Sequence, residues 1–510
     1  MKGLGSHPQI LEDAENRVCR AYCNYYKPNR TEDERCRGFK LAALLLSLEA
    51  LPDIGPDNVG PFDPLYKHSL LRQLLCEQCP FFVDGCDFTA AETSFNAMPC
   101  GGLILISTLL KHALIEENDL KLIDDVDRKS YSSLVLSPQC ALKRLEHYYV
   151  YHITHDDLYE VNEKGFHFLE QCEIGEKSEL FEPDLSFVKY CVEEGLLIHR
   201  SRPQSRKFWT EAAPVPSLRY LEWLVTRKCN LKCAHCYLGE PQDSEFPKEL
   251  IEPLLDQFSA MQGLRVLVSG GEPTIYRHFE YLNEIIDRYP LRFVLLTNGL
   301  IIDASFAQAL KFHEVQISLD GMRQGHETIR GSGTFSRVLR AMDSVRDAGI
   351  DLSVATMIHR GNLSEWDDMK RLIEGYGVKE WNIDYPCNRG RWELHPDLFV
   401  EERVAAEFMR YGFGGSYHGS DDGWTCGRHL AAVLPSGEVC RCALYSDLVL
   451  GAVTTGLRVA WEGVQHIPIA QTSCRDCIHA NQCGGGCRYR AGDQYAKDSV
   501  MCARFVGDSS

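Results

Sequence analysis

Cysteine is the residue type of this chain whose number and spacing most clearly indicate chemistry. The chain has 22 cysteines among its 510 residues. Disulfide scaffolds are usually short secreted chains, whereas this chain is long and its first residues, Met1–Pro8, contain no apolar signal core. In a reducing cytoplasm, cysteines at tight spacing more often bind metals. The sequence therefore predicts a cytoplasmic metalloprotein.

The first cysteine block follows directly after the apolar run Tyr220–Val225. It contains Cys229, Cys233 and Cys236. Three thiolates on one short loop suit three irons of a four-iron cluster, and the fourth iron, without a protein ligand, is where chemistry occurs. A zinc site is the alternative, with His235 as a fourth ligand, because structural zinc takes four.

Three polar loops further along the chain each follow an apolar run of strand length. Their candidate binding residues are Gly270, Gly271, Glu272, Pro273, Asn298, Ser318 and Asp320. The two glycines allow a ligand to approach the backbone, and the glutamate accepts from an ammonium group. In a parallel barrel the loops at the C-terminal ends of the strands build the active site, so we expect these loops to meet at one site.

The segment between about residues 218 and 399 alternates candidate strands with helix-length segments. The candidate strands are Tyr220–Val225, Val266–Ser269, Phe293–Thr297, Val315–Ser318, Leu352–Thr356 and Trp381–Asp384. Lys248–Met261, Phe335–Ala348 and Glu365–Tyr376 are the helix-length segments between them. This alternation predicts an α/β fold whose six parallel strands curve into a partial (β/α)6 barrel similar to a TIM barrel.

The cysteine loop and the strand-end loops together resemble the radical S-adenosylmethionine superfamily. The resemblance implies a [4Fe–4S] cluster on the three cysteines, with S-adenosyl-L-methionine chelating the open iron. It implies that Gly270–Pro273 bind the methionyl amino group, that Ser318 and Arg330 contact the ribose and the carboxylate, and that Tyr237 lies near the adenine. It assigns cofactor binding to Asn298 and Asp320 as well.

The reaction implied by this resemblance is reductive cleavage of S-adenosyl-L-methionine to a 5′-deoxyadenosyl radical, which abstracts hydrogen from the substrate. The electron would come from a low-potential donor such as flavodoxin or ferredoxin. The cofactor performs the difficult step, and the protein supplies orientation and water exclusion.

A second cysteine block lies in the C-terminal tail. Its members are Cys426, Cys442, Cys474, Cys477, Cys483, Cys487 and Cys502. A zinc ribbon is the alternative, but seven ordered thiolates exceed one four-cysteine site and approach what two clusters need.

The spacing of this second block resembles the SPASM domain of radical S-adenosylmethionine enzymes that modify peptides and proteins. The resemblance implies two auxiliary [4Fe–4S] clusters. The outer cluster would use Cys474, Cys477, Cys483 and Cys502. The inner cluster would use Cys426, Cys442 and Cys487. The fourth inner ligand stays open between Cys440, Cys387 and a site left free for substrate.

Residues 134–200 form a small α/β module ahead of the barrel. Tyr148–Asn162 predicts two short strands around a turn, and Gly165–Cys172 and Pro183–Glu194 predict helices. A winged-helix-like module with only a packing role is one interpretation. The pattern also resembles the PqqD-like RiPP recognition element, which implies a peptide or protein substrate bound through residues 134–200 as an added strand.

The N-terminal region is mostly helical in pattern and carries a third set of cysteines. They are Cys19, Cys23, Cys36, Cys76, Cys79, Cys86 and Cys100. Their spacing predicts metal binding, with zinc and a further iron–sulfur cluster both open. The domain boundaries we predict are residues 1–133, 134–200, a linker at 201–217, the barrel at 218–411 and the tail at 412–510.

Charge and hydropathy exclude several classes of partner. No apolar run reaches membrane-spanning length, and a net charge of −18 disfavours binding to nucleic acid phosphates. We therefore expect neither a membrane nor a nucleic acid partner.

The function we predict is radical modification of a peptide or protein, giving a crosslink or an oxidation. Alternatives are radical modification of a small molecule such as a tetrapyrrole, a sulfatase-type protein activation, and a non-catalytic electron carrier. Ala443 stands where sulfatase-activating enzymes carry an Asp, and an electron carrier has no use for an open iron.

Overall fold

The computed structural model describes residues 39, 71–76, 79, 100–111, 134–174, 185–199, 209–414 and 423–506. The chain divides into two compact units. One comprises residues 1–135, 184–191 and 198–202, and the other comprises 136–183, 192–197 and 203–510. The first unit contains helix α5 (Gly101–Lys111), within the region whose pattern is mostly helical. No helix of the described residues is long and apolar enough to cross a membrane.

The second unit contains the predicted partial barrel, which has six parallel strands in the order β11-β10-β9-β8-β7-β6. These strands are β6 (Tyr220–Thr226), β7 (Arg265–Gly270), β8 (Arg292–Thr297), β9 (Glu314–Ser318), β10 (Asp351–Met357) and β11 (Glu380–Asp384). All six predicted strands are confirmed. The sequential order means that every connection is a strand–helix–strand crossover, the arrangement that parallel neighbours require.

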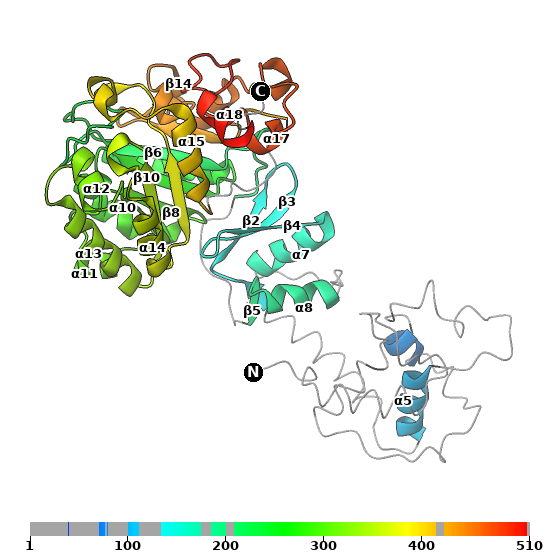
Figure 1. Ribbon diagram of the computed structural model, residues 1–510. Coiled ribbons are helices and arrows are strands. Elements are labelled where there is room, and N and C mark those ends of the chain that lie inside the picture. The colour runs from blue at the N-terminus through cyan, green and yellow to red at the C-terminus, as the bar shows by residue number, and fades with distance from the viewer. Residues whose placement is uncertain are drawn as a thin grey trace. The chain divides into compact units, whose positions relative to one another are not determined.

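Helices cover the outer face of this sheet (Figure 1). They are α9 (Ile251–Ala260), α10 (Phe279–Ile285), α11 (Ala304–Ala309), α12 (Arg323–Arg330), α13 (Thr334–Asp347) and α14 (Trp366–Tyr376). Helix α13 shows why they pack there: Phe335, Val338, Met342 and Val345 recur at helical spacing and are all buried. The polar residues between them face solvent.

The tail extends the same sheet. Strand β12 (Leu430–Val433) pairs in parallel with β6, and the antiparallel strands β13 (Glu438–Cys440) and β14 (Val449–Ala452) follow. The sequence analysis predicted none of these three strands. Because β12 adds directly to the first barrel strand, the cysteines of the tail are joined to the barrel by backbone hydrogen bonds as well as by side chains.

The second unit also contains an antiparallel sheet of β2 (Cys140–Arg144), β3 (Tyr148–His152) and β4 (Asp157–Val161), followed by α7 (Glu163–Ile174). The two predicted strands and the helix are confirmed, and β2 is additional. Helix α8 (Leu185–Glu193) confirms the other predicted helix.

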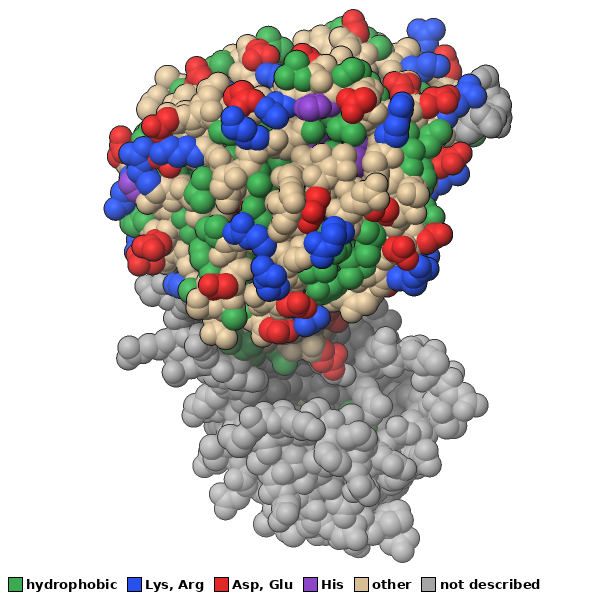
Figure 2. Space-filling model, turned by 60° about the vertical axis from the view of Figure 1, so that its left-hand side comes forward, with side chains coloured by type: hydrophobic (Ala, Val, Ile, Leu, Met, Phe, Trp, Pro, Cys, Tyr) green, Lys and Arg blue, Asp and Glu red, His purple; other side chains and the backbone are tan. Residues whose placement is uncertain are grey.

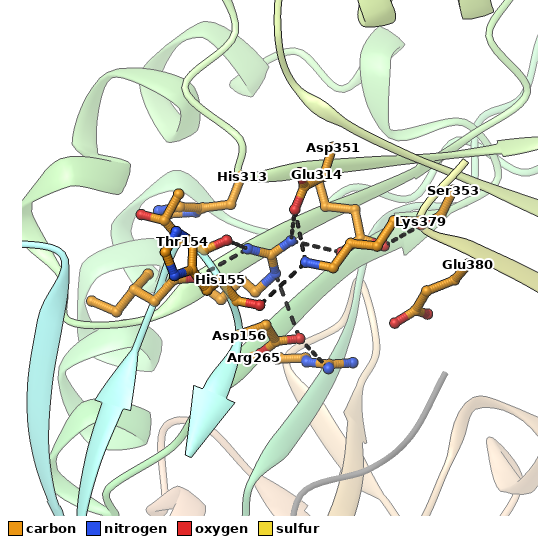
Figure 3. A network of polar contacts seen from close by, with 12 residues as sticks. Thr154, His155, Asp156, Arg265, His313, Glu314, Asp351, Ser353, Lys379 and Glu380 are labelled. Carbon is orange, nitrogen blue, oxygen red and sulfur yellow. Dashed lines mark hydrogen bonds and ion pairs between the residues drawn. The ribbon is translucent and has the colours of Figure 1, made fainter. Parts of the chain in front are cut away.

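The turn between β3 and β4 closes the N-terminal end of the barrel (Figure 3). The guanidinium of Arg292, which is fully buried, donates to the carbonyl oxygens of Ile153 at 3.0 Å and Thr154 at 2.6 Å. It also pairs with the carboxylates of Glu314 at 2.8 Å and Asp351 at 2.6 Å. Arg292, Glu314 and Asp351 are the first residues of β8, β9 and β10. The network therefore lies at the strand ends opposite the polar loops.

Charged side chains of both signs are interspersed on the face of the molecule drawn in Figure 2. They do not gather into one large patch of a single sign on that face. This distribution suits a protein whose net charge is −18 and offers no continuous basic surface there for a nucleic acid.

Candidate active site

A cavity of about 950 Å³ opens at the C-terminal ends of the barrel strands and continues into the barrel interior. Its wall includes the first cysteine loop, the strand-end loops and the cysteine-rich tail. The volume lies near the upper end of the range for ligand pockets. The residues that line this cavity are spread over a stretch of more than 250 residues of the sequence. This cavity is the candidate active site.

The first cysteine loop forms one wall. Cys229, Cys233 and Cys236 all line the cavity, and their charges interact. Burial raises the pKa of Cys229 to about 11, and the nearby Glu272 carboxylate adds to this rise. Burial also raises the pKa of Cys233. Because burial alone favours neutral thiols, their joint ionisation requires a positively charged centre between them, which an iron–sulfur cluster provides.

The structure shows a reason, not expected from the sequence, why the next loop has glycine at two positions. A Cβ at Gly270 would lie 2.3 Å from the carbonyl oxygen of Thr226, and a Cβ at Gly271 would lie 2.2 Å from that of Lys228. The loop after β7 therefore packs directly on the backbone that leads into the cysteine loop. Close approach of backbone to backbone, in addition to any ligand, requires glycine here.

Glu272 ties this loop to the end of β8. It is 1% exposed, and its carboxylate accepts from the backbone N–H and hydroxyl of Thr274, from the hydroxyl of Thr297 at 2.7 Å and from the backbone N–H of Asn298 at 2.8 Å. Burial raises its pKa despite these donors. Pro273 begins a short 3-10 helix directly after it. Glu272 lines the cavity with four protein donors already in place, and its contact with an ammonium group stays a prediction.

Arg330 and Asp320 form a buried ion pair beside the cysteine loop. The guanidinium also lies 3.9 Å from the sulfur of Cys233 and 3.4 Å from Nε2 of His235. Arg330 and Ser318 line the cavity, whereas Asp320 lies behind Arg330 and accepts from the backbone N–H of Met357. The structure therefore places Asp320 as a positioning residue for Arg330.

The barrel interior adds polar residues that the sequence analysis did not select. Glu222, Gln316 and Asn382, from β6, β9 and β11, line the cavity. The Glu222 carboxylate accepts from the backbone N–H of Ala443 at 3.2 Å, and burial raises its pKa. The sequence could have indicated Glu222, because it is a charged residue in the middle of an otherwise apolar strand. Strands of a buried parallel sheet are normally apolar throughout.

Tyr237 also lines the cavity, and it packs against the buried cluster of Leu224, Ala432, Cys440 and Ala443. It therefore lies where the first cysteine loop meets the tail. Its contact with an adenine ring stays a prediction.

The tail cysteines influence one another's pKa values in two sets, and their division into ligands of two clusters stays a prediction of the resemblance. Cys474, Cys477, Cys483 and Cys502 interact with one another: burial raises the pKa values of Cys483, to about 11, and of Cys502, and the other thiols of the group raise them further. The charges of Cys426 and Cys442 interact, as do those of Cys426 and Cys487. These three residues line the cavity.

Among the residues that the structure describes, no three Cys, His, Asp or Glu side chains converge on a position for one metal ion. The choice between iron–sulfur clusters and zinc for the thiols of the tail stays a prediction.

Most of the N-terminal cysteines lie outside the residues that the structure describes. Cys19, Cys23, Cys36 and Cys86 lie outside the described residues. Cys76, Cys79 and Cys100 are half-buried, and the backbone N–H of Cys79 donates to the carbonyl oxygen of Cys76 at 3.0 Å. Metal binding by this set stays a prediction.

Comparison with known proteins agrees with the barrel geometry. Residues 223–373 match the family model of the Radical SAM superfamily. The chain is a radical SAM enzyme. The matched residues cover all three cysteines of the first block and β7 to β10.

Several proteins of similar sequence carry names that describe different substrates. Mycofactocin maturase MftC of Mycobacterium ulcerans is 28% identical over 302 residues, which cover 52% of this chain and 82% of that protein. Fe-coproporphyrin III synthase of Methanosarcina barkeri is 32% identical, covering 35% of this chain and 47% of that protein. The antilisterial bacteriocin subtilosin biosynthesis protein AlbA of Bacillus subtilis is 28% identical, covering 43% and 54%.

A solved structure with a similar fold is that of SuiB from Streptococcus suis, bound to precursor peptide SuiA. It is 14% identical in sequence, has a TM-score of 0.54, and the match covers 72% of this chain and 99% of that chain. This likeness extends beyond the barrel and supports the fold of the radical SAM unit as a whole.

Proposed function

We propose that this protein is a peptide or protein maturase that holds three [4Fe–4S] clusters and abstracts hydrogen from a peptide side chain or backbone. The observation that carries the proposal is the single cavity whose wall contains both the first cysteine loop and the inner tail cysteines. A substrate bound there lies between the site that generates the radical and a second redox centre.

The names of the relatives support the same class. MftC is a maturase, AlbA belongs to the biosynthesis of a bacteriocin, and SuiB is bound to its precursor peptide. Residues 218–411 would then be the radical barrel and 412–510 a SPASM domain. The outer auxiliary cluster would use Cys474, Cys477, Cys483 and Cys502, and the inner cluster Cys426, Cys442 and Cys487.

When bound, the first cluster and S-adenosyl-L-methionine supply a 5′-deoxyadenosyl radical. The chain's own residues do the rest. Arg330 lies against Cys233 and His235, where its positive charge stabilises the thiolate. Burial lowers the pKa of His235 to about 3, so the ring is neutral and adds no second positive charge. Glu222 is one of the carboxyl groups that line this cavity, and we assign to it the role of taking a proton from a substrate that is being oxidised.

The module of residues 134–200 would bind the peptide, and strand β4 is the edge available for it. The outer edge of β2 is already used: the carbonyl oxygen of Arg144 accepts from the backbone N–H of Ala213 at 2.8 Å, and its N–H donates to the side chain of Gln262 at 3.4 Å. Strand β4 is the other edge of this sheet, in which the strand order is β2-β3-β4. A peptide added as a strand would therefore pair with β4.

The register identifies which residues of β4 would meet that peptide. Arg144 pairs with Tyr148, and Tyr148 pairs with Val161. Because the backbone groups of Arg144 point away from β3, those of Tyr148 and Val161 point toward each other, and the N–H of Glu160 points outward. Glu160→Pro removes that outward donor without breaking the β3–β4 pairing, and Glu160→Ala is the matched control.

The direct test is the intact mass of short peptides encoded beside this gene, after anaerobic incubation with the enzyme, S-adenosyl-L-methionine and a reductant. Loss of two hydrogens from one peptide is the expected result. Glu160→Pro should weaken binding of that peptide at least about tenfold, and Glu160→Ala should leave it within about twofold. Unchanged peptide masses, with 5′-deoxyadenosine still formed, would contradict the proposal.

A tetrapyrrole substrate is the second candidate, because two groups of relatives are named Fe-coproporphyrin III synthase and AdoMet-dependent heme synthase. Their matches cover at most half of each of those proteins. Incubating the enzyme with Fe-coproporphyrin III under the same conditions separates the two candidates. The mass of Fe-coproporphyrin III would change only if the enzyme acts on tetrapyrroles.

A further inference from the structure

We propose that Cys387 is the fourth protein ligand of the inner auxiliary cluster, so that this cluster is closed by four thiolates. The proposal rests on the proposed function, which supplies the cluster itself. Cys387 lies in the loop after β11, the last barrel strand, about 40 residues before Cys426, and it is not part of the tail.

The structure brings Cys387 to the inner group. Its thiol hydrogen-bonds that of Cys487, and both residues line the cavity together with Cys426 and Cys442. Arg441, next to Cys442, donates to the carbonyl oxygen of Cys426 at 2.9 Å. The ring centroids of Tyr445 and Tyr489, which follow Cys442 and Cys487 closely in sequence, lie 5.2 Å apart. Four cysteines therefore surround one region of the cavity wall, and four is the number that a closed [4Fe–4S] cluster needs.

Arg389 holds the loop of Cys387 against the loop of Cys442. Its guanidinium donates to the carbonyl oxygen of Leu444, to the hydroxyl of Ser446 at 2.9 Å and to the carboxylate of Asp447 at 3.0 Å. Three contacts from one side chain to residues 444–447 fix the distance between these two loops. A guanidinium is well suited to this role because its donors are held in one rigid plane.

Arg490 holds the same loop against Cys487 from the other side. It donates to the carboxylate of Asp384 at 2.8 Å, to the carbonyl oxygen of Tyr385 at 2.9 Å and to the carboxylate of Asp498 at 2.8 Å. Asp498, which is 1% exposed, in turn accepts from the backbone N–H of Cys487 at 2.8 Å. Cys387 is thus positioned by an arginine on each side.

Cys440, the other candidate in sequence, faces elsewhere. It is fully buried, its sulfur lies 3.7 Å from the carbonyl oxygen of Ala432 and 3.4 Å from that of Cys442, and it packs with Leu224 and Ala443. It is not among the residues that line the cavity. Its thiol therefore completes a core contact.

The number of protein ligands of the inner cluster decides between two roles for it. A cluster with an open iron would bind substrate directly, whereas a cluster with four thiolate ligands has no vacant position. With Cys387 in place, the inner cluster exchanges electrons with the substrate and does not coordinate it.

The test uses the full-length chain carrying Cys229→Ala, Cys233→Ala and Cys236→Ala, reconstituted anaerobically, so that the radical cluster is absent from every sample. Cys387→Ala is added to this parent, and Cys440→Ala is the matched control. Iron content, Mössbauer spectra and electron paramagnetic resonance of the reduced samples are recorded with and without imidazole. A Cys387→Ser variant checks that the change reflects the ligand and not misfolding, because serine oxygen keeps a weaker ligand at the same position.

We expect Cys387→Ala to lose roughly one to four irons per chain or to give a resonance that shifts with imidazole. The parent and Cys440→Ala should give the same imidazole-insensitive resonances of the two auxiliary clusters, and Cys387→Ser should keep the iron with an altered resonance of the inner cluster. Loss of iron in Cys440→Ala instead, or an imidazole-sensitive parent, would overturn the assignment of Cys387. A parent without any reducible cluster would overturn the proposed function itself.

Discussion

The backbone N–H of Arg391 donates to the carbonyl oxygen of Cys236 at 2.9 Å, and this contact connects the two cysteine groups of the cavity. The side chain of Arg391 also donates to the carbonyl oxygen of Cys233 at 3.1 Å. Cys387, four residues earlier in the same loop, contacts Cys487. One short segment therefore fixes the position of the first cysteine loop relative to the tail.

Gly390 makes this arrangement possible. Its φ is +67°, and a Cβ there would lie 2.6 Å from the carbonyl oxygens of both Cys236 and Tyr237. Only glycine accepts that conformation and that approach without strain. The segment that contains Gly390 and Arg391 thus helps to set the distance between the proposed radical cluster and the proposed inner cluster.

Cys233→Ala should abolish cleavage of S-adenosyl-L-methionine while leaving iron in the tail, because the three thiols of the first loop are separate from the tail groups. The measurements are 5′-deoxyadenosine formed under anaerobic reducing conditions and iron bound per chain. Cys172→Ala, which alters a buried core thiol of α7, is the control and should keep both. Retained cleavage in Cys233→Ala would show that the first loop does not hold the radical cluster.

Glu222→Gln should lower the amount of modified peptide formed per 5′-deoxyadenosine by at least about tenfold, in line with the usual contribution of a positioned acid or base. The amide retains the size of the side chain and the hydrogen bond from Ala443, but it no longer accepts a proton from the substrate. Iron content and cleavage of S-adenosyl-L-methionine without peptide should stay unchanged. Equal yields from Glu222→Gln and the parent enzyme would remove Glu222 from the reaction.

The sequence predicted the barrel well because its signals are local. Each of the six strands is an apolar run followed by a polar loop, and the observed strands begin and end within about a residue of those runs. Strand β2 was missed because Lys143 interrupts it. That lysine is buried, since its ammonium donates to the carbonyl oxygens of Gly263 at 2.6 Å and Pro290 at 2.9 Å. A charged residue therefore occupies a position where a local pattern expects an apolar one.

The site was only partly predictable, because several of its contacts join distant segments. The position of Cys387 depends on Arg389 and Arg490, which lie about 100 residues apart. Glu222 was hidden inside an apolar run, and its partner Ala443 lies 221 residues later. No local pattern contains such pairs. The spacing of the cysteines therefore identified them as candidate ligands, but it could not predict which of them lie together.

Arg292→Met should destabilise the second unit by about 3–5 kcal/mol, because it leaves the carboxylate of Glu314 buried near the barrel's N-terminal end without its cation, whereas Asp156 keeps its pair with Arg265. The urea midpoint, followed by tryptophan fluorescence, measures the loss. Arg346→Met is the control: Arg346 pairs with Asp343 and Asp347 on the surface, where such pairs contribute less than about 1 kcal/mol. Equal midpoints for the two variants would mean that the buried network adds no stability.

The same network bears on truncation. Deleting residues 1–200 would remove the Ile153 and Thr154 carbonyl oxygens that accept from Arg292, so the barrel itself would be destabilised. The role of the module in peptide binding is therefore better tested with the single change Glu160→Pro than with this deletion, because Glu160→Pro leaves these contacts intact.

Glu146→Gln should reduce stability at neutral pH but not at low pH. Burial raises the pKa of Glu146, yet the backbone N–H of Ser217 and the guanidinium of Arg219 outweigh it and hold the pKa at about 2. Their contacts are 2.8 and 2.6 Å. Because the folded-state pKa lies below the unfolded value of 4.5, the stabilisation is complete above about pH 5 and is lost as the pH falls toward 2.

The urea midpoints of the parent and of Glu146→Gln should therefore differ at pH 7 by the equivalent of about 1.5–3 kcal/mol and converge as the pH approaches 2. Glu163→Gln is the control, since the Glu163 carboxylate is 69% exposed and should give no such trend. A difference that stays constant from pH 7 to pH 3 would mean that Glu146 stabilises the junction through packing and not through its charge. Convergence in that range would identify the Glu146–Arg219 pair as a charged link between the module and the first barrel strand.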